Sequence, residues 1–534
     1  MNFLWNLIIL LKSMFEYYLL FENQNQYINF CNMSQDCELF DNLNIDVISD
    51  MLCGITKEYP IKYIQKMNSD YTVAIFRNEI FRELNNTVAL AFIEEIFNKI
   101  SSLNIKFREI SDITNNNQKN IVNIHIMFQY FELLKMISKF LVPFNSIGLS
   151  RASKVFNEYL TRPEIKSCEQ KIYKAKKLLD SYLKLSIEIN RFQKKITFSN
   201  EKKELSESFK ALDCLCHELT GIKLVEPFTI VDNVYPTLLE EFVIESILKT
   251  HEDLRSTMEG IPDVQLIWDE IISFKVQISF YYTYLKLMER LREKHMPFCF
   301  PSFDISCHID AKNVYDLSLA VRNINDENFC QTLNDVDLNA ETYGFILTGA
   351  NQGGKTTYLR STGMVVYLAM CGCPVPAESA SLYPYKKIYT LFSGEEIKES
   401  GESRFEREVK RYLYLYTNFG KEILVLLNEF FIGTNRLEGV EILGQCICDL
   451  IKKEATFGCV THYQEIYKLI GDNADNSIRY LQSRIFSDND DRKKYIIKKG
   501  MPDGRAYSER ITEKYGMTYR DLLKLFNIGS DDDV

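Results

Sequence analysis

The segment Gly349–Thr356, with the sequence GANQGGKT, constrains the fold of this chain more than any other part of it. It matches the pattern GxxxxGK[ST] at each fixed position, which is typical of a loop whose backbone N–H groups surround nucleotide phosphates. An apolar run at 345–348 precedes the loop, and a helix is expected from Lys355. The N-terminus of such a helix favours bound phosphate. The segment therefore predicts an α/β domain that binds a nucleotide.

The residues of this loop have different expected roles. Lys355 is predicted to supply a cation to the β- and γ-phosphates, and Thr356 to offer its hydroxyl to Mg²⁺. The glycines allow the backbone to curl so that its N–H groups face the phosphates. The predicted nucleotide-binding residues of the loop are Gly349, Asn351, Gly353, Gly354, Lys355, Thr356 and Thr357.

After residue 340 the sequence has an α/β pattern. Uninterrupted apolar strands are expected at 345–348, 423–427 and 455–461, with helical segments between them. Strands without polar alternation are typical of a parallel sheet that helices cover on both faces. Together with the loop before Lys355, this pattern predicts a P-loop NTPase domain after residue 340.

The sequence before residue 340 is largely helical. Residues 36–145 mostly favour helix, and long helices are expected at 163–195 and 263–295. In the second, apolar residues alternate at spacings of four and three: Ile267, Ile271, Phe274, Ile278, Tyr281, Leu285 and Met288. Helices of about 45 Å at about 1.5 Å per residue suit levers or spacers, although ordinary bundle helices remain an alternative.

These patterns predict a multidomain protein, because a chain of 534 residues is too long for one hydrophobic core. The fold class expected is a largely α-helical core and lever region followed by an α/β P-loop NTPase domain. The predicted divisions are an apolar segment at 1–35, the helical region at 36–339, the ATPase domain at 340–515 and a tail at 516–534.

The charge and the cysteines set further limits. The net charge of -10 means that any contact with nucleic acid comes from local basic runs. The candidates are Lys171, Lys174, Lys176 and Lys177, and Arg492, Lys493, Lys494, Lys498 and Lys499, with solvated faces as the alternative.

The 14 cysteines include no CxxC pair. Their spacing favours structural free thiols in a reducing cytoplasm over a zinc site.

The N-terminal segment is apolar at residues 3–11, but Lys12 and Glu16 interrupt it before it is long enough to span a bilayer. An amphipathic helix is expected there, and membrane contact through residues 1–30 remains open.

Six segments in order resemble the ATPase domain of the MutS family, over about residues 340–515. The loop segment TGANQGGKTTYLR resembles the MutS P-loop, with Ala350 and Gln352 where the family has proline and methionine. The other five are Val375–Ala377 (VPA), Gly401–Glu408 (GxSxFxxE), Leu426–Glu429 (LLNE, resembling LLDE), Gly433–Gly439 (resembling GTSTxDG) and Thr461–Tyr463 (THY).

The resemblance implies an ATPase of ABC type that works as a homodimer with ATP and Mg²⁺. Ser403 would then begin a helix that reaches the γ-phosphate held by the partner chain, whereas by itself a serine there is a simple helix cap. Glu429 would polarise the attacking water, and His462 would sense the γ-phosphate. A solvated acid at a strand end and a structural histidine are the alternatives for these two residues.

Asn428 departs from the family pattern, which has aspartate at this position. Asparagine keeps an oxygen acceptor but lacks the negative charge, and charge-assisted hydrogen bonds are about twice as strong as neutral ones. Thr356 and Asn428 are therefore the predicted metal-site residues, with nucleotide binding kept and hydrolysis slowed.

The mismatch-wedge motif of the family, GxFxE, is not found. Phe-x-Glu occurs at Phe81–Glu83, Phe107–Glu109 and Phe156–Glu158, without the preceding glycine and in helical sequence each time. The stretch before the P-loop is also too short for the mismatch, connector, core and clamp domains of a mismatch sensor.

The sequence thus predicts a cytoplasmic MutS-like ATPase that depends on DNA and moves helical levers around non-sequence-specific double-stranded DNA, with other repair proteins as further partners. Two alternatives remain open. One is a nucleotide-gated dimeric scaffold with weak or no hydrolysis. The other is an ATPase that acts on structured RNA or ribosomes.

Overall fold

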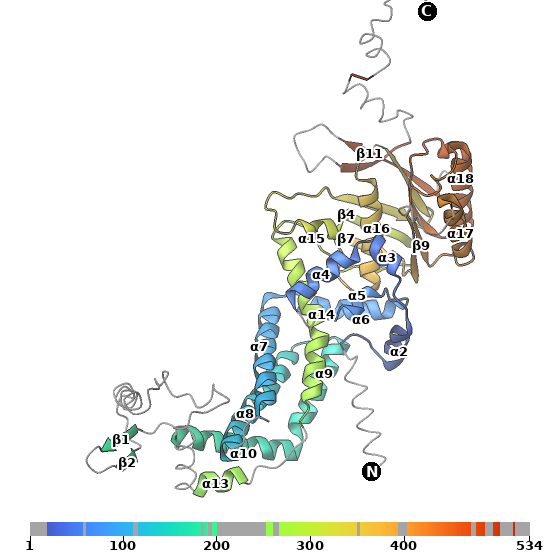
Figure 1. Ribbon diagram of the computed structural model, residues 1–534. Helices are drawn as coiled ribbons and strands as arrows, with labels where there is room; N and C mark the ends of the chain where they lie inside the picture. The colour runs from blue at the N-terminus through green and yellow to red at the C-terminus, as the bar shows by residue number, and fades with distance from the viewer. Residues whose placement is uncertain are drawn as a thin grey trace, which may run out of the picture. The chain divides into compact units, whose positions relative to one another are not determined.

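A computed structural model describes residues 19–56, 60–110, 116–182, 186–190, 195–199, 252–259, 266–349, 353–392, 403–470, 477–485, 495–501 and 516–517. The chain forms two compact units, one of Met1–Asn85 with Val276–Val534 and the other of Asn86–Lys275. Figure 1 shows their elements. The finer divisions at residues 35, 339 and 515 stay predictions.

A six-stranded sheet forms the centre of the first unit, with the order β12-β11-β6-β10-β9-β8. Its strands are β6 (Gly344–Gly349), β8 (Lys387–Phe392), β9 (Ile423–Asn428), β10 (Thr456–Val460), β11 (Ile478–Ile485) and β12 (Tyr495–Lys499). All neighbours are parallel except β11 and β12. The three strands predicted from apolar runs, β6, β9 and β10, are confirmed as parallel neighbours. Their carboxyl ends therefore meet at one edge of the sheet, where ligands of α/β folds bind.

Helices cover both faces of this sheet (Figure 1): α16 (Lys355–Met370) on one face, and α17 (Arg404–Tyr416) and α18 (Arg436–Lys452) on the other. Alternate strand residues point to opposite faces. Leu426 of β9 lies against Gly363 of α16, while Val425 and Leu427 belong to the apolar cluster formed with α17 and α18. A short helix, α19 (Ile466–Ile470), follows β10 and packs against α18.

A second sheet, of order β3-β7-β4-β5, lies in the same unit. Its strands are β3 (Ser302–Phe303), β4 (Cys307–Val314), β5 (Asn334–Asn339) and β7 (Ser379–Leu382). Helix α15 (Leu317–Arg322) follows β4, with Asp316 as its cap. The segment from β4 to β5 thus leads directly into β6 and the predicted phosphate-binding loop.

The N-terminal helices also belong to the first unit: α2 (Gln24–Asn32), α3 (Cys37–Asn42), α4 (Ile45–Ile55), α5 (Lys62–Gln65) and α6 (Tyr71–Leu84). Arg77 of α6 is fully buried and donates hydrogen bonds of 2.9 Å to the carbonyls of Leu20 and Cys371. Cys371 caps the C-terminal end of α16, where a cation is favourable. Residues far apart in sequence therefore hold the helix that follows the loop.

The second unit is mainly a helical bundle. It contains α7 (Thr87–Glu109), α8 (Asn116–Leu141), α9 (Ile147–Thr161), α10 (Pro163–Tyr182), α13 (Glu252–Glu259) and the hairpin of β1 (Ser186–Asn190) and β2 (Lys195–Ser199). Helix α8 packs against α7, α9 and α10. The division between the units falls inside α14 (Trp268–Arg292), which is one continuous helix.

The prediction of two long helices is half correct. The stripe on α14 is confirmed, because its members within the helix are all buried: Ile271, Phe274, Ile278, Tyr281, Leu285 and Met288. The helix expected over 163–195 is wrong beyond Tyr182, since Ser186–Asn190 and Lys195–Ser199 pair as antiparallel strands. Ile187 and Ile189 alternate with polar residues, and this period of two favours strand over helix.

Other expectations concern single features. The three Phe-x-Glu segments lie in α6, α7 and α9, so their helical character is confirmed. The cysteines in the described ranges are free. No helix in those ranges is long and apolar enough to cross a bilayer, and residues 1–18, which include the apolar N-terminal run, lie outside them.

Candidate functional site

The predicted phosphate-binding loop connects β6 to α16 at the carboxyl edge of the main sheet. Gly349 ends β6 with a φ of 130°, and a Cβ there would lie 2.6 Å from the Ser483 Oγ of β11. Only glycine fits this position. Gly354, with a φ of 78°, is the N-cap of α16. Asn351 lies outside the described residues.

Lys355 lies inside the loop rather than in solvent. Its side chain is 5% exposed, and its Nζ donates a hydrogen bond of 3.0 Å to the Gly349 carbonyl. Burial lowers the pKa of the ammonium group, and the charge of Glu429 opposes this shift. An anion bound at the loop would raise the pKa of the Lys355 ammonium group, as the charge of Glu429 does.

Thr356 and Asn428, the predicted metal-site residues, contact each other. The Thr356 hydroxyl donates to the Asn428 Oδ1 at 3.1 Å, which joins the first turn of α16 to the end of β9. Among the residues that the structure describes, no cluster of three His, Cys, Asp or Glu side chains could hold a metal. A hydroxyl and an amide oxygen beside a phosphate site do fit Mg²⁺, which keeps several waters and takes oxygen ligands from its substrate.

Glu429 and His462, the predicted catalytic residues, also lie together. Their side chains form a contact of 2.8 Å between Glu429 Oε1 and His462 Nε2. A carboxylate can only accept, so Nε2 carries the hydrogen. The hydrogen bond from His462 is the largest cause that lowers the pKa of Glu429, while burial opposes it. Glu429 is therefore held in its ionised, proton-accepting form.

Ser403 is the N-cap of α17, where its Oγ accepts a hydrogen bond of 3.1 Å from the Glu406 N–H. This is the ordinary cap of a helix start. It also places Ser403 at the positive end of the helix dipole. Its expected role towards a second copy of the chain stays a prediction.

The turn after β9 contains contacts that the sequence did not reveal. The Phe431 N–H donates to Glu408 Oε2 at 3.0 Å, and the Tyr463 hydroxyl donates to the Phe431 carbonyl at 2.9 Å. Glu408 and Tyr463 are the last residues of the GxSxFxxE and THY segments. The two motifs could have pointed to Glu408 and Tyr463 in the sequence. They do not reveal that both residues bind Phe431.

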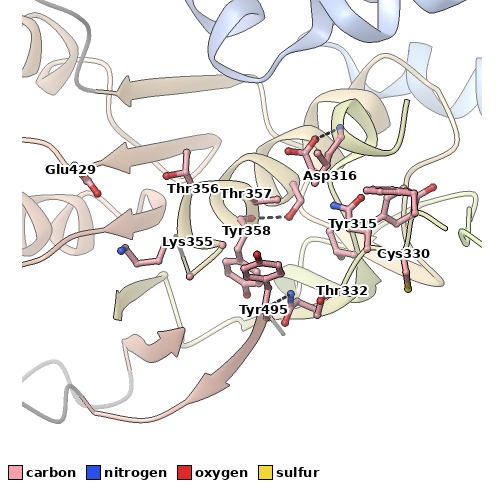
Figure 2. Close-up of a pocket in the computed structure, with 18 residues that line it drawn as sticks. Tyr315, Asp316, Cys330, Thr332, Lys355, Thr356, Thr357, Tyr358, Glu429 and Tyr495 are labelled. Atoms are coloured by element: carbon pink, nitrogen blue, oxygen red, sulfur yellow. Dashed lines mark hydrogen bonds between the residues drawn. The ribbon is translucent and has the colours of Figure 1, made fainter. Parts of the chain in front are cut away.

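A cavity of about 440 Å³ extends from the loop, as Figure 2 shows. Lys355, Thr356 and Glu429 line one end. The aromatic residues Phe329 and Tyr495 line it as well. The Asn334 amide binds the Tyr495 carbonyl at 3.3 Å and the Ile497 N–H at 2.8 Å, which holds β12 beside the cavity. Pockets of this size hold small organic ligands.

The predicted basic runs are exposed in part. Lys171, Lys174 and Lys177 are exposed on α10, and Lys176 lies over the Phe128 ring. Lys499 of β12 pairs with Asp337 at 2.9 Å. Arg492, Lys493 and Lys494 lie outside the described residues, and Lys498 is in β12.

The fold and this arrangement define a class: a largely helical protein whose C-terminal α/β domain carries a candidate nucleotide site at the carboxyl edge of its sheet. Residues 345–517 match the family model of MutS domain V. The DNA mismatch repair protein MutS of Chlorobaculum tepidum is 36% identical over 139 residues, which cover 26% of this chain. The C-terminal domain of this chain is therefore similar to domain V of MutS proteins. The aligned segment spans 16% of the length of that relative.

Proposed function

We propose that this protein binds ATP with Mg²⁺ at the loop before Lys355 and hydrolyses it slowly. One observation carries the proposal. Lys355, the Thr356–Asn428 pair and the Glu429–His462 pair come from three separate segments and meet at the carboxyl edge of the parallel strands of one sheet. Residues suited to bind phosphate, to bind a metal ion and to act as a general base are thereby brought together in one site.

Each residue of the site has a separate proposed role. Lys355 and the first N–H groups of α16 would hold the phosphates, and Thr356 with Asn428 would hold Mg²⁺, which neutralises phosphate charge when bound. Glu429 would accept a hydrogen bond from the attacking water and orient it. His462 would keep Glu429 ionised and fixed. We assign the cavity lined by Phe329 and Tyr495 to the adenine base of ATP.

We also propose that the active species is an ABC-type homodimer in which Ser403 of one copy completes the nucleotide site of the other. The support is the placement of Ser403 at the exposed N-terminus of α17. Backbone N–H groups at such a helix end bind anions readily.

Double-stranded DNA is the macromolecular ligand that we propose, contacted without sequence selection by lysines such as those on α10. Phosphate contacts need only cations and give no sequence readout. Binding and release of the nucleotide would change these DNA contacts through helical levers. The continuous helix α14 is the first candidate for such a lever. Mismatch-repair partners and a cytoplasmic location belong to the same proposal, and the free thiols of the described part agree with a reducing compartment.

A steady-state phosphate-release assay tests this function against the nucleotide-gated scaffold, which Asn428 favours. Purified protein is assayed with Mg²⁺ and ATP, with and without double-stranded DNA or structured RNA, beside the Glu429→Gln variant. The proposal expects slow turnover that DNA stimulates and that Glu429→Gln lowers to a small residual rate. Tight ATP binding with no turnover in any condition would support the scaffold instead. Stimulation by RNA alone would support a ribosomal or RNA partner.

A further inference from the structure

The turn that carries Glu429 has an unfavourable backbone. Glu429 has a φ of 51° and Phe431 a φ of 61°, in the left-handed region that non-glycine residues seldom adopt. Such residues are strained and persist only where their surroundings fix them. Something must therefore hold the backbone between these two residues.

Two buried side chains form hydrogen bonds with the N–H and the carbonyl of Phe431. Glu408 of α17 accepts from the Phe431 N–H at 3.0 Å, and Tyr463, after β10, donates to its carbonyl at 2.9 Å. Glu408 and Tyr463 are 6% and 7% exposed. Because an unpaired buried backbone group is costly, removing either partner destabilises this particular conformation. We call Glu408, Phe431 and Tyr463 the turn clamp.

A glycine of α18 makes room for the turn clamp. A Cβ on Gly439 would lie 2.2 Å from the Tyr463 hydroxyl oxygen and 2.8 Å from the Phe431 carbonyl oxygen. Any other residue would separate these two atoms or displace the turn. The clamp is thus built from three segments: α17, the turn after β9 and the residues that follow β10.

Glu429 itself is fixed on its other sides. Its N–H donates to the Val460 carbonyl at 2.9 Å, and its carboxylate accepts from His462 at 2.8 Å. The direction of its side chain then depends on the backbone that follows it. Resting on the proposed ATPase function, we propose that Glu408 and Tyr463 are positioning residues: through the Phe431 peptide they set the place of the Glu429 carboxylate for attack of water on the γ-phosphate.

A pair of tyrosine variants tests this proposal. Tyr463→Phe keeps the ring and removes the bond to the Phe431 carbonyl. Tyr412→Phe is the matched control, because Tyr412 is equally buried at 8% exposed in the same core and its hydroxyl bonds to Asp449 of α18 instead. We expect Tyr463→Phe to lower kcat about tenfold, as for one lost hydrogen bond, with KM for ATP unchanged. Tyr412→Phe should keep kcat.

Combined variants separate positioning from general damage. In a Glu429→Gln background, Tyr463→Phe should cause no further loss, since it acts only through the residue already removed. Glu408→Gln keeps an acceptor oxygen and should retain more kcat than Glu408→Ala. An equal fall of kcat in Tyr463→Phe and Tyr412→Phe, or a further loss in the Glu429→Gln background, would overturn the proposal.

Amide hydrogen exchange tests the clamp independently of turnover. Peptides covering residues 429–433 should exchange faster in Glu408→Ala and Tyr463→Phe than in Tyr412→Phe or the parent protein. Absence of turnover in the parent protein would contradict the proposed ATPase and leave this measurement decisive for the clamp. Unchanged exchange in both clamp variants would refute the clamp even where ATP is hydrolysed.

Discussion

At the end of β9, Asn428 presents an amide oxygen to the Thr356 hydroxyl, where the MutS pattern has a carboxylate. Asn428→Asp restores the charge without changing the size of the side chain. The difference between a neutral and a charged hydrogen bond is about 1 kcal/mol, so we expect turnover to rise about fivefold. Steady-state phosphate release at saturating ATP measures this. Asn428→Ala, which removes the oxygen, should instead lower turnover, and equal rates in all three proteins would refute this role for position 428.

We expect His462 to set the acid side of the pH profile of turnover. Its hydrogen bond favours ionised Glu429 and lowers the pKa of that carboxyl. Loss of the bond in His462→Ala therefore raises the pKa of Glu429, and the acidic fall of kcat should move to higher pH. His462→Gln retains an N–H donor and should shift less. A profile in His462→Ala that keeps the same acidic midpoint would contradict this assignment.

On the scale of elements, α18 offers a matched pair of glycines. Gly439→Ala should lower both stability and turnover, because its Cβ would lie 2.2 Å from the Tyr463 hydroxyl oxygen; overpacking of this kind costs about 1–3 kcal/mol. Gly444→Ala meets nothing nearer than Leu469 Cβ at 3.6 Å, an ordinary contact. It should leave stability unchanged or raise it by about 0.5–1 kcal/mol, as alanine favours helix. The urea midpoints of the two variants measure the difference, and similar midpoints would contradict the packing described here.

The sequence predicted those elements whose signals are local. The loop, α16 and the strands β6, β9 and β10 follow from motif spacing and apolar runs, and parallel pairing then brings Glu429 and His462 to one edge. The turn clamp could not be predicted, because Glu408, Phe431 and Tyr463 meet only after three segments have packed. The contact of Arg77 with Cys371 likewise joins residues far apart in the chain. The hairpin after Tyr182 was missed because a few alternating residues were outweighed by the helical run before them.

At the scale of the whole molecule, the proposed sharing of the nucleotide site between two copies predicts complementation between two inactive variants. Lys355→Ala and Ser403→Ala should each lose ATPase activity as homodimers. A mixed dimer contains one site with both defects and one with neither. Since about half of the dimers in an equal mixture are mixed, about a quarter of the parent activity should return. Activity that stays at the sum of the two separate variants would show that Ser403 does not act on the other copy.

Every role proposed for these residues requires a triphosphate at the loop before Lys355, and equilibrium dialysis with labelled ATP and Mg²⁺ detects it. The parent protein is compared with Lys355→Ala and with Lys386→Ala, which removes an exposed lysine paired with Glu422. We expect the parent protein and Lys386→Ala to retain ATP, and Lys355→Ala, still folded by circular dichroism, to lose it. Failure of the parent protein to retain ATP, or equal retention by Lys355→Ala, would show that the loop before Lys355 does not bind the nucleotide.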